Sequence, residues 1–360
     1  MKQFTLLGIL LLTTSYGLQA QNETLQQQIN KMVDETIVIG VAAGYSVDGT
    51  TIEQIAAGYA DKKTEKEFKL DTKVRMGSIA KPMTALAIMQ LVEQKKLELD
   101  KPIQTYIPDY PKHKKTQITV RHLLSHTSGI AGYKDAKESN TTTEYSKLYD
   151  ALSLFKDRDL LFEPGTQYSY TTYGYTVLGA IIEAITEQNY ETYIQEHIFA
   201  KAKMHNTGID KFDKELENES KLYNRKGGKG KAKLAKENNL SNRIPAGGFY
   251  TTLTDMLKFG NGVINNIFVK KETLALMREH HSLEKEKNAY GFGWFLYNPK
   301  PNEGAVIGHT GGQIGCTSFL FIVPEKKAVS IILANTSRAR SSVDPIAVHL
   351  LQLSTEKIKP

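Results

Sequence analysis

The chain has 360 residues, more than a single hydrophobic core usually serves, so we expect two lobes or one large domain carrying an insertion. Its 40% hydrophobic and 24% charged content is typical of a globular protein and excludes a disordered or collagen-like chain. One cysteine excludes an intramolecular disulfide and multi-cysteine metal sites, and the net charge of +7 indicates a polyanionic partner only where the charges cluster.

The amino terminus has the pattern of a signal peptide. Lys2 precedes an apolar run over residues 4–12, and small and polar residues follow up to Ala20. That run is too short to cross a bilayer, and no later stretch approaches the required length of about 20 apolar residues. We therefore predict that residues 1–20 are a signal peptide and that the protein is exported, periplasmic or secreted, without a transmembrane segment.

After the signal peptide, the spacing of apolar residues predicts both strands and helices. Segments 37–46 and 51–59 flank turn residues and predict a β-hairpin. Apolar residues surround segment 83–92 on all sides, which predicts a buried helix. The remaining predictions are a helix over 175–185, strands over 305–307, 318–323 and 328–333, and a closing helix over 343–353. Strands near both chain ends favour one sheet built from both termini, with a helical lobe inserted.

A basic run spans residues 225–236, with six lysines and arginines, three glycines and no acidic residue. The alternating charges before it indicate a solvated loop. Aromatic side chains that would stack on bases are nearly absent, so the run does not indicate nucleic-acid binding.

Several common site patterns are absent or incomplete. There is no Gly-x-Ser-x-Gly elbow and no His-Glu-x-x-His sequence. His122 and His126 are four residues apart, but no third ligand accompanies them, which favours a structural role over zinc. Cys316 lies just before an apolar strand, which favours a buried, unreactive thiol. We therefore predict no metal and no cofactor.

Ser78 and Lys81 stand at the start of the predicted buried helix. A serine hydroxyl needs a neighbouring base to act as a nucleophile, and three residues apart on a helix places both side chains on one face. Burial would lower the pKa of the lysine toward a useful value, and the helix amino terminus presents free N–H groups to developing negative charge. The same four residues also fit a serine cap followed by a solvent-facing lysine.

The surroundings of this pair resemble a known family. Residues 74–81, with the helix that follows, resemble the active-site helix of the serine beta-lactamase and penicillin-binding family. The nearest branch is that of the class C beta-lactamases, with its D-Ala-D-Ala carboxypeptidases and esterases. Segments 122–129, 164–175, 246–248 and 309–312 resemble further motifs of this branch in the same order. The resemblance extends from about residue 37 to residue 333.

The resemblance implies a role for each matching residue. Ser78 would be the acylated nucleophile, Lys81 its proton partner, and Tyr170 the tyrosine that shares general-base work and protonates the leaving group. An alternative register places Tyr168 in that role. The implied oxyanion hole consists of the backbone N–H groups of Ser78 and Gly312. The implied substrate-binding residues are Thr172, His309, Thr310, Gly311 and Gly312.

Two residues depart from the pattern of the family. His309 stands where a lysine is usual, and we expect it to be only partly charged near pH 7. Thr172 replaces an asparagine, and its hydroxyl is shorter and offers one donor where the amide offers two. Both departures favour a peptidase or esterase over an efficient beta-lactamase.

The resemblance implies an α/β (α+β type), beta-lactamase/transpeptidase-like fold, with an antiparallel sheet flanked by helices and an inserted, mainly helical lobe. We assign residues 21–76 and 241–360 to the sheet lobe and 77–240 to the helical lobe, with a basic loop at 211–239. The predicted function is an exported serine hydrolase, a D-stereospecific peptidase of the D-Ala-D-Ala carboxypeptidase type or an esterase. Its partner would be a small-molecule or peptide acyl substrate, with cell-wall peptide as one candidate. The alternatives are a class C-type beta-lactamase and a noncatalytic protein that binds cell-wall peptide or a partner.

Overall fold

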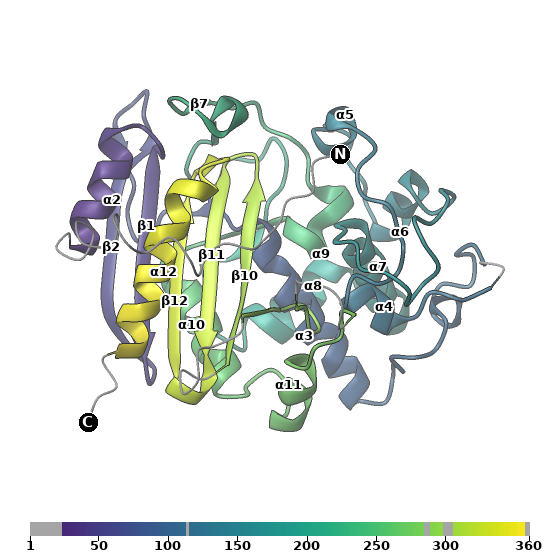
Figure 1. The fold of residues 1–360 in the computed structure, drawn as a ribbon. Coiled ribbons are helices and arrows are strands. Elements are labelled where there is room, and N and C mark those ends of the chain that lie inside the picture. The colour runs from purple at the N-terminus through teal and green to yellow at the C-terminus, as the bar shows by residue number, and fades with distance from the viewer. Residues whose placement is uncertain (1–23, 113–114, 284–288, 298–304, 357–360) are drawn as a thin grey trace.

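The structure is a computed structural model that describes residues 24–112, 115–283, 289–297 and 305–356 (Figure 1). The predicted signal peptide, residues 1–20, lies outside the described residues. Within the described part, no helix is both long enough and apolar enough to cross a bilayer.

A seven-stranded sheet joins the two ends of the chain, as predicted (Figure 1). Its strands, in spatial order, are β3 (Lys66–Glu67), β2 (Thr50–Asp61), β1 (Gly40–Val47), β12 (Ala328–Ala334), β11 (Cys316–Val323), β10 (Val306–Gln313) and β9 (Phe295–Tyr297). Every pairing in this sheet is antiparallel. The predicted hairpin is β1 with β2, and the link between the chain ends is the β1–β12 pair, which runs from Val41 opposite Ala334 to Val47 opposite Ala328.

Helices cover both faces of the sheet. One face carries α2 (Leu25–Asp34) and α12 (Arg340–Glu356), and α10 (Leu253–Ile264) lies against the other (Figure 1). Side chains alternate along each strand. Thus Ile332 packs in the core beneath α2 and α12, while Ile331 and Leu333 join the larger core on the opposite face.

The larger core continues into the helical part of the chain, around α3 (Ala80–Glu93). Residues 80–91 of α3 are all buried, which confirms the predicted central helix. The other helices of this region are α4 (Val120–Leu124), α5 (Ala136–Ser139), α6 (Leu148–Ala151), α7 (Tyr173–Thr186), α8 (Tyr190–Ile194), α9 (Ile244–Gly247) and α11 (Lys271–Met277). Both α7 and α9 pack against α3. The residue boundaries of the two lobes stay predictions.

The basic run is more ordered than a solvated loop. Strands β6 (Tyr223–Asn224) and β7 (Lys233–Leu234) pair as a hairpin, and β13 (Thr336–Ser337) joins them in a small sheet. Arg225 is only 8% exposed, and its Nε donates to the carbonyl of Gly230. The interpretation as an exposed loop is therefore wrong for Arg225, because its side chain turns back into the hairpin. A second small sheet contains β4 (Val74–Arg75), β8 (Phe249–Thr251) and β5 (Gly208–Ile209).

Candidate active site

Ser78 lies on a 3₁₀ turn, η1 (Gly77–Ile79), that leads directly into α3. Gly77 has a φ of +59°, and a Cβ at this position would lie 2.9 Å from the backbone nitrogen of Gly312. Only glycine fits a left-handed backbone with so close a neighbour. This turn therefore brings half-buried Ser78 beside β10, the strand that contains four of the five predicted substrate-binding residues.

Lys81 is fully buried on the first turn of α3. Its Nζ donates to the carbonyl oxygen of Ala246 at 2.9 Å and lies 3.1 Å from Ser78 Oγ. Burial, with a smaller contribution from the positive charge of Arg243, lowers the pKa of Lys81 to about 7. A substantial fraction of Lys81 is thus neutral near pH 7, and the neutral amine has a lone pair that can accept the Ser78 proton.

Tyr170 is 37% exposed and lies against the lysine. Lys81 Nζ is 4.9 Å from the centre of the Tyr170 ring, and the Tyr170 hydroxyl hydrogen-bonds with the Ser78 side chain. Desolvation raises the pKa of Tyr170 well above 10, although the hydrogen bond with Ser78 acts in the opposite direction. Tyr170 is therefore protonated at neutral pH and suited to donate a proton. Tyr168, the alternative, packs edge-on against His126 at 6.1 Å between ring centres.

Thr172 caps α7 through its backbone, because its carbonyl accepts the N–H groups of Tyr175 and Thr176. Its half-buried side chain makes no capping hydrogen bond. Thr172 is thus two residues after Tyr170 in the chain, and its hydroxyl makes no hydrogen bond with the described residues.

Strand β10 pairs with β11 from Ile307 to Gln313 but with β9 only from Val306 to Gly308. Beyond Gly308, no described strand pairs with its outer edge, which includes Thr310, Gly311 and Gly312. A Cβ at Gly311 would lie 2.1 Å from the carbonyl oxygen of Met76, so the strand can approach η1 only with glycine there. The open edge is suited to pair with an extended substrate backbone.

His309 is buried, with 1% of its surface exposed. Its Nδ1 is 2.7 Å from the carbonyl oxygen of Thr310, which only accepts, so the proton is on Nδ1 and Nε2 accepts from the Tyr290 hydroxyl at 3.1 Å. Burial, together with the charge of Lys81, lowers the pKa of His309 to about 3. The expectation of a partly charged histidine is therefore wrong, because burial removes the ring from water and the charge of Lys81 acts on it.

Two residues of the site were not predicted from the sequence. Tyr290 was not identified at all, and His126 was not expected to lie against Tyr170. The His126 ring is 4.3 Å from the Tyr170 ring and 4.8 Å from the Tyr290 ring, measured between centres. Both side chains are fully buried behind the site. The tyrosine-rich stretch near Tyr170 was a signal for an aromatic cluster, whereas nothing local marks Tyr290.

Two structural interpretations are confirmed. His122 accepts the backbone N–H of Thr119 through Nδ1 and so caps α4, which is a structural role. Cys316 is buried, and burial raises the pKa of its thiol to about 12.

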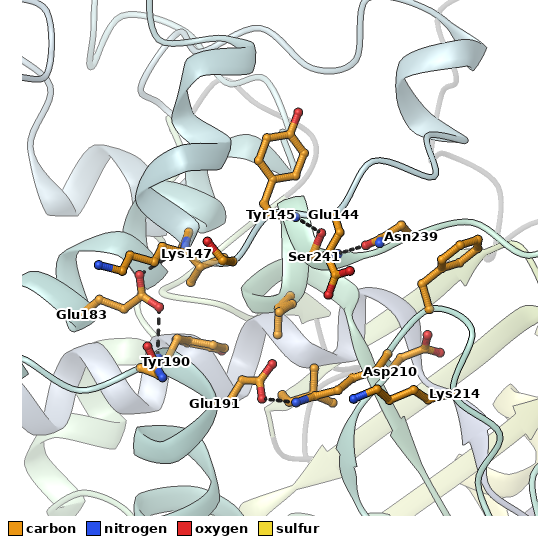
Figure 2. A pocket seen from close by; sticks show the side chains of 17 residues that line it. Glu144, Tyr145, Lys147, Glu183, Tyr190, Glu191, Asp210, Lys214, Asn239 and Ser241 are labelled. Carbon is orange, nitrogen blue, oxygen red and sulfur yellow. Dashed lines mark hydrogen bonds and ion pairs between the residues drawn. The ribbon is translucent and has the colours of Figure 1, made fainter.

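A separate pocket of about 270 Å³ opens in the helical region (Figure 2). Figure 2 shows Glu183 and Tyr190 on one wall, and Asn239 and Ser241 on another. Lys211 and Glu191 form an ion pair of 2.8 Å on its lining. Neither Ser78 nor any other predicted site residue lines it, so it is distinct from the candidate site at Ser78.

Comparisons with known proteins identify the family and the fold. A family model described as Beta-lactamase matches residues 25–353. The serine beta-lactamase-like protein LACTB, mitochondrial, of Homo sapiens is 28% identical over 401 residues, covering 84% of this chain and 72% of that protein. An octameric penicillin-binding protein homologue from Pyrococcus abyssi has a TM-score of 0.78 at 26% identity, covering 91% of this chain and 76% of that chain.

The fold is also that of the D-amino acid amidase from Ochrobactrum anthropi, solved in complex with L-phenylalanine amide. That structure has a TM-score of 0.79 at 22% identity, and the match covers 93% of this chain and 98% of that chain. With the matching model spanning most of the sequence, the chain belongs to the beta-lactamase family.

Proposed function

We propose that the protein is a serine hydrolase that forms an acyl-enzyme on Ser78. The observation that carries the proposal is the 3.1 Å contact between Ser78 Oγ and Lys81 Nζ, in which the lysine is fully buried. Burial lowers the lysine pKa to about 7, so a proton acceptor stands within hydrogen-bond distance of the hydroxyl at neutral pH.

The proposed reaction has two steps. Ser78 Oγ bonds to the acyl carbon while its proton moves to Lys81, and the N–H groups of Ser78 and Gly312 stabilise the oxyanion. Tyr170 donates its proton to the leaving group and regains one from Lys81 as the carbon–leaving-group bond breaks. Water then attacks the acyl-enzyme, giving up a proton to the same groups, and releases the acid and Ser78.

Within this reaction class we propose an esterase or a D-stereospecific peptidase rather than a beta-lactamase. Thr172 offers one hydroxyl where an asparagine amide offers two donors, which weakens recognition of a substrate amide. His309 is neutral, so it supplies no fixed charge to a substrate carboxylate. The single donor of Thr172 favours esters over amides, and the neutral His309 leaves any charge selection to other residues of the site. Cell-wall peptide is one peptide to be tried.

Intact-protein mass spectrometry tests the proposal. Residues 21–360 are exposed briefly to a penicillin or to an activated ester, with Ser78→Ala as the control. We expect an acyl adduct, or turnover of the ester, in the wild type alone. Penicillin loss without a lasting adduct would favour a beta-lactamase instead. Absence of any reaction would refute acyl transfer and favour a noncatalytic binding protein.

We also propose that the protein is exported, on the basis of Lys2, the apolar run and the small residues that end at Ala20. Sequencing the amino terminus of the protein recovered from a periplasmic or culture fraction tests this. A start near Gln21 is expected, and an intact Met1 in the cytosolic fraction alone would contradict it.

A further inference from the structure

Arg243 stands beside the candidate site without a role in the proposed reaction. It ends the 3₁₀ turn η6 (Ser241–Arg243) and is followed at once by α9, whose Ala246 carbonyl binds Lys81. Its charge acts on Lys81 and lowers the pKa of that lysine. Arg243 is thus joined directly to α9, the short helix that contacts Lys81 beside Ser78.

This guanidinium is buried but has no counterion. Its exposed fraction is 5%, its face lies over the Tyr133 ring at 5.0 Å, and one Nη2 hydrogen bond goes to the carbonyl of Ser139. Among the described residues, no carboxylate lies within ion-pairing distance, and no hydrogen bond engages Nε or Nη1.

The contrast with Arg75 shows what is missing. Arg75 is equally buried, yet both Asp210 carboxylate oxygens accept its hydrogen bonds, at 2.7 and 3.0 Å, and Asn238 satisfies a further nitrogen. A cation removed from water without such partners costs several kcal/mol, so an unpaired one is expected where an anion arrives from outside. The side-chain amide of Asn242, next to Arg243, is also buried without a partner, so this turn has spare hydrogen-bonding capacity.

The known chemistry of arginine fits one class of ligand. Tyr133 supports the plane of the guanidinium from one face and Ser139 fixes one nitrogen, so Nε and Nη1 remain as oriented donors for carboxylate oxygens. No competing cation comes from His309, which is neutral.

We propose that Arg243 forms an anion subsite of the cleft, which binds a carboxylate on the acyl substrate and makes the enzyme prefer anionic substrates. This proposal rests on the proposed function, since the subsite would position a substrate for Ser78. It adds a specificity determinant at Arg243, on the turn that leads into α9.

Matched ester pairs test the subsite. The 4-nitrophenyl half-esters of succinic, glutaric and adipic acid carry an acyl-chain carboxylate, and 4-nitrophenyl esters of butyric, valeric and caproic acid are neutral chains of the same lengths. We expect the wild type to have a higher kcat/KM for at least one half-ester than for its neutral partner. In Arg243→Met this ratio should fall on the order of 10- to 100-fold, as for loss of a charge-assisted hydrogen bond, and Arg243→Lys should keep part of it.

Two controls separate recognition from other effects. Arg225→Met removes another buried arginine, one located in the basic hairpin, and should leave the ratio unchanged. If Arg243 acted only on the pKa of Lys81, both esters of a pair would change together in Arg243→Met. An unchanged ratio in that variant, with hydrolysis intact, would overturn the subsite while leaving the proposed function standing.

A binding measurement separates the two proposals. Isothermal titration calorimetry of Ser78→Ala with glutaric monoanilide and with neutral valeranilide needs no acyl transfer. We expect the anionic anilide to bind more tightly, and this difference to disappear in Ser78→Ala/Arg243→Met. Binding of this kind without hydrolysis of any ester would refute the proposed function alone, and equal binding of both anilides would refute the subsite.

Discussion

Replacing Lys81 with methionine tests whether the fold holds this lysine partly neutral. The pKa of Lys81 falls from 10.5, its ordinary value, to about 7 in the folded protein. Because the unfolded chain binds the Lys81 proton more tightly than the folded protein does, protonation favours unfolding. The resulting loss in the free energy of unfolding is largest below pH 7 and disappears as the pH rises toward 10.5. At about 1.4 kcal/mol per pKa unit, burial of this amine costs about 4 kcal/mol at pH 7 and about 2 kcal/mol at pH 9.

Methionine has a similar length and no charge, so Lys81→Met removes this cost together with the hydrogen bond to Ala246. Urea unfolding of both proteins at pH 7, 8 and 9, followed by the fluorescence of buried Trp294, measures the difference. We expect the stability of the variant relative to the wild type to fall by about 2 kcal/mol between pH 7 and pH 9. Lys229→Met, at an exposed position in the basic hairpin, is the matched control and should show no such change.

A difference that stays constant from pH 7 to pH 9 would refute the reasoning, because Lys81 would then keep its proton at pH 7 and could not accept one from Ser78. The same pKa predicts the kinetics. The acylation rate of the wild type should rise with pH and level off above about pH 7, as the neutral lysine becomes available. Lys81→Met should lose acylation at every pH.

Three further substitutions have expected outcomes. Thr172→Asn restores two amide donors and should raise turnover of amides and penicillins more than that of esters, measured as kcat/KM for each. Gly311→Ala places a Cβ 2.1 Å from a backbone oxygen and should lower the unfolding temperature by several degrees, whereas Gly312→Ala, which meets open space, should not. Tyr290→Phe removes the donor to the buried histidine of β10 and should cost about 1–3 kcal/mol in urea unfolding.

Each expectation has an outcome that would contradict it. Equal gains on esters and amides would show that the asparagine acts on the reaction and not on the substrate amide. Equal melting of the two glycine variants would show that β10 does not pack on η1 as described. An unaltered stability of Tyr290→Phe would mean that His309 finds another partner.

Local patterns predicted the main elements, and the resemblance to the family selected Ser78 and Lys81 as the candidate reacting pair. The spacing of Ser78 and Lys81 places both on one helical face whatever the rest of the chain does, and the apolar surroundings of α3 predict burial directly. Strand β10 is longer than the predicted segment 305–307. Its glycines have low strand propensity, and the hydrogen bonds with β11 keep this segment extended.

The charges of the site were not predictable in the same way. His309 is neutral because Tyr290, from another segment, accompanies it in a buried cluster near Lys81. Arg243 has no carboxylate partner among the described residues because the fold brings none close to it, and this depends on how the whole chain is arranged. Residue spacing contains no information on either, since desolvation and missing partners arise only when distant segments meet.

The open edge of β10 also bears on how the protein behaves in a concentrated solution. Unpaired strand edges are templates on which other chains add strands, and proteins that tolerate them keep them short or irregular. Here the edge begins after Gly308 and ends at Gln313, it contains two adjacent glycines with low strand propensity, and a glycine turn at Gly315 closes it. An edge of this length accommodates a short extended ligand and offers little to a second copy of the sheet, so ligand access and resistance to edge-to-edge aggregation follow from the same few residues.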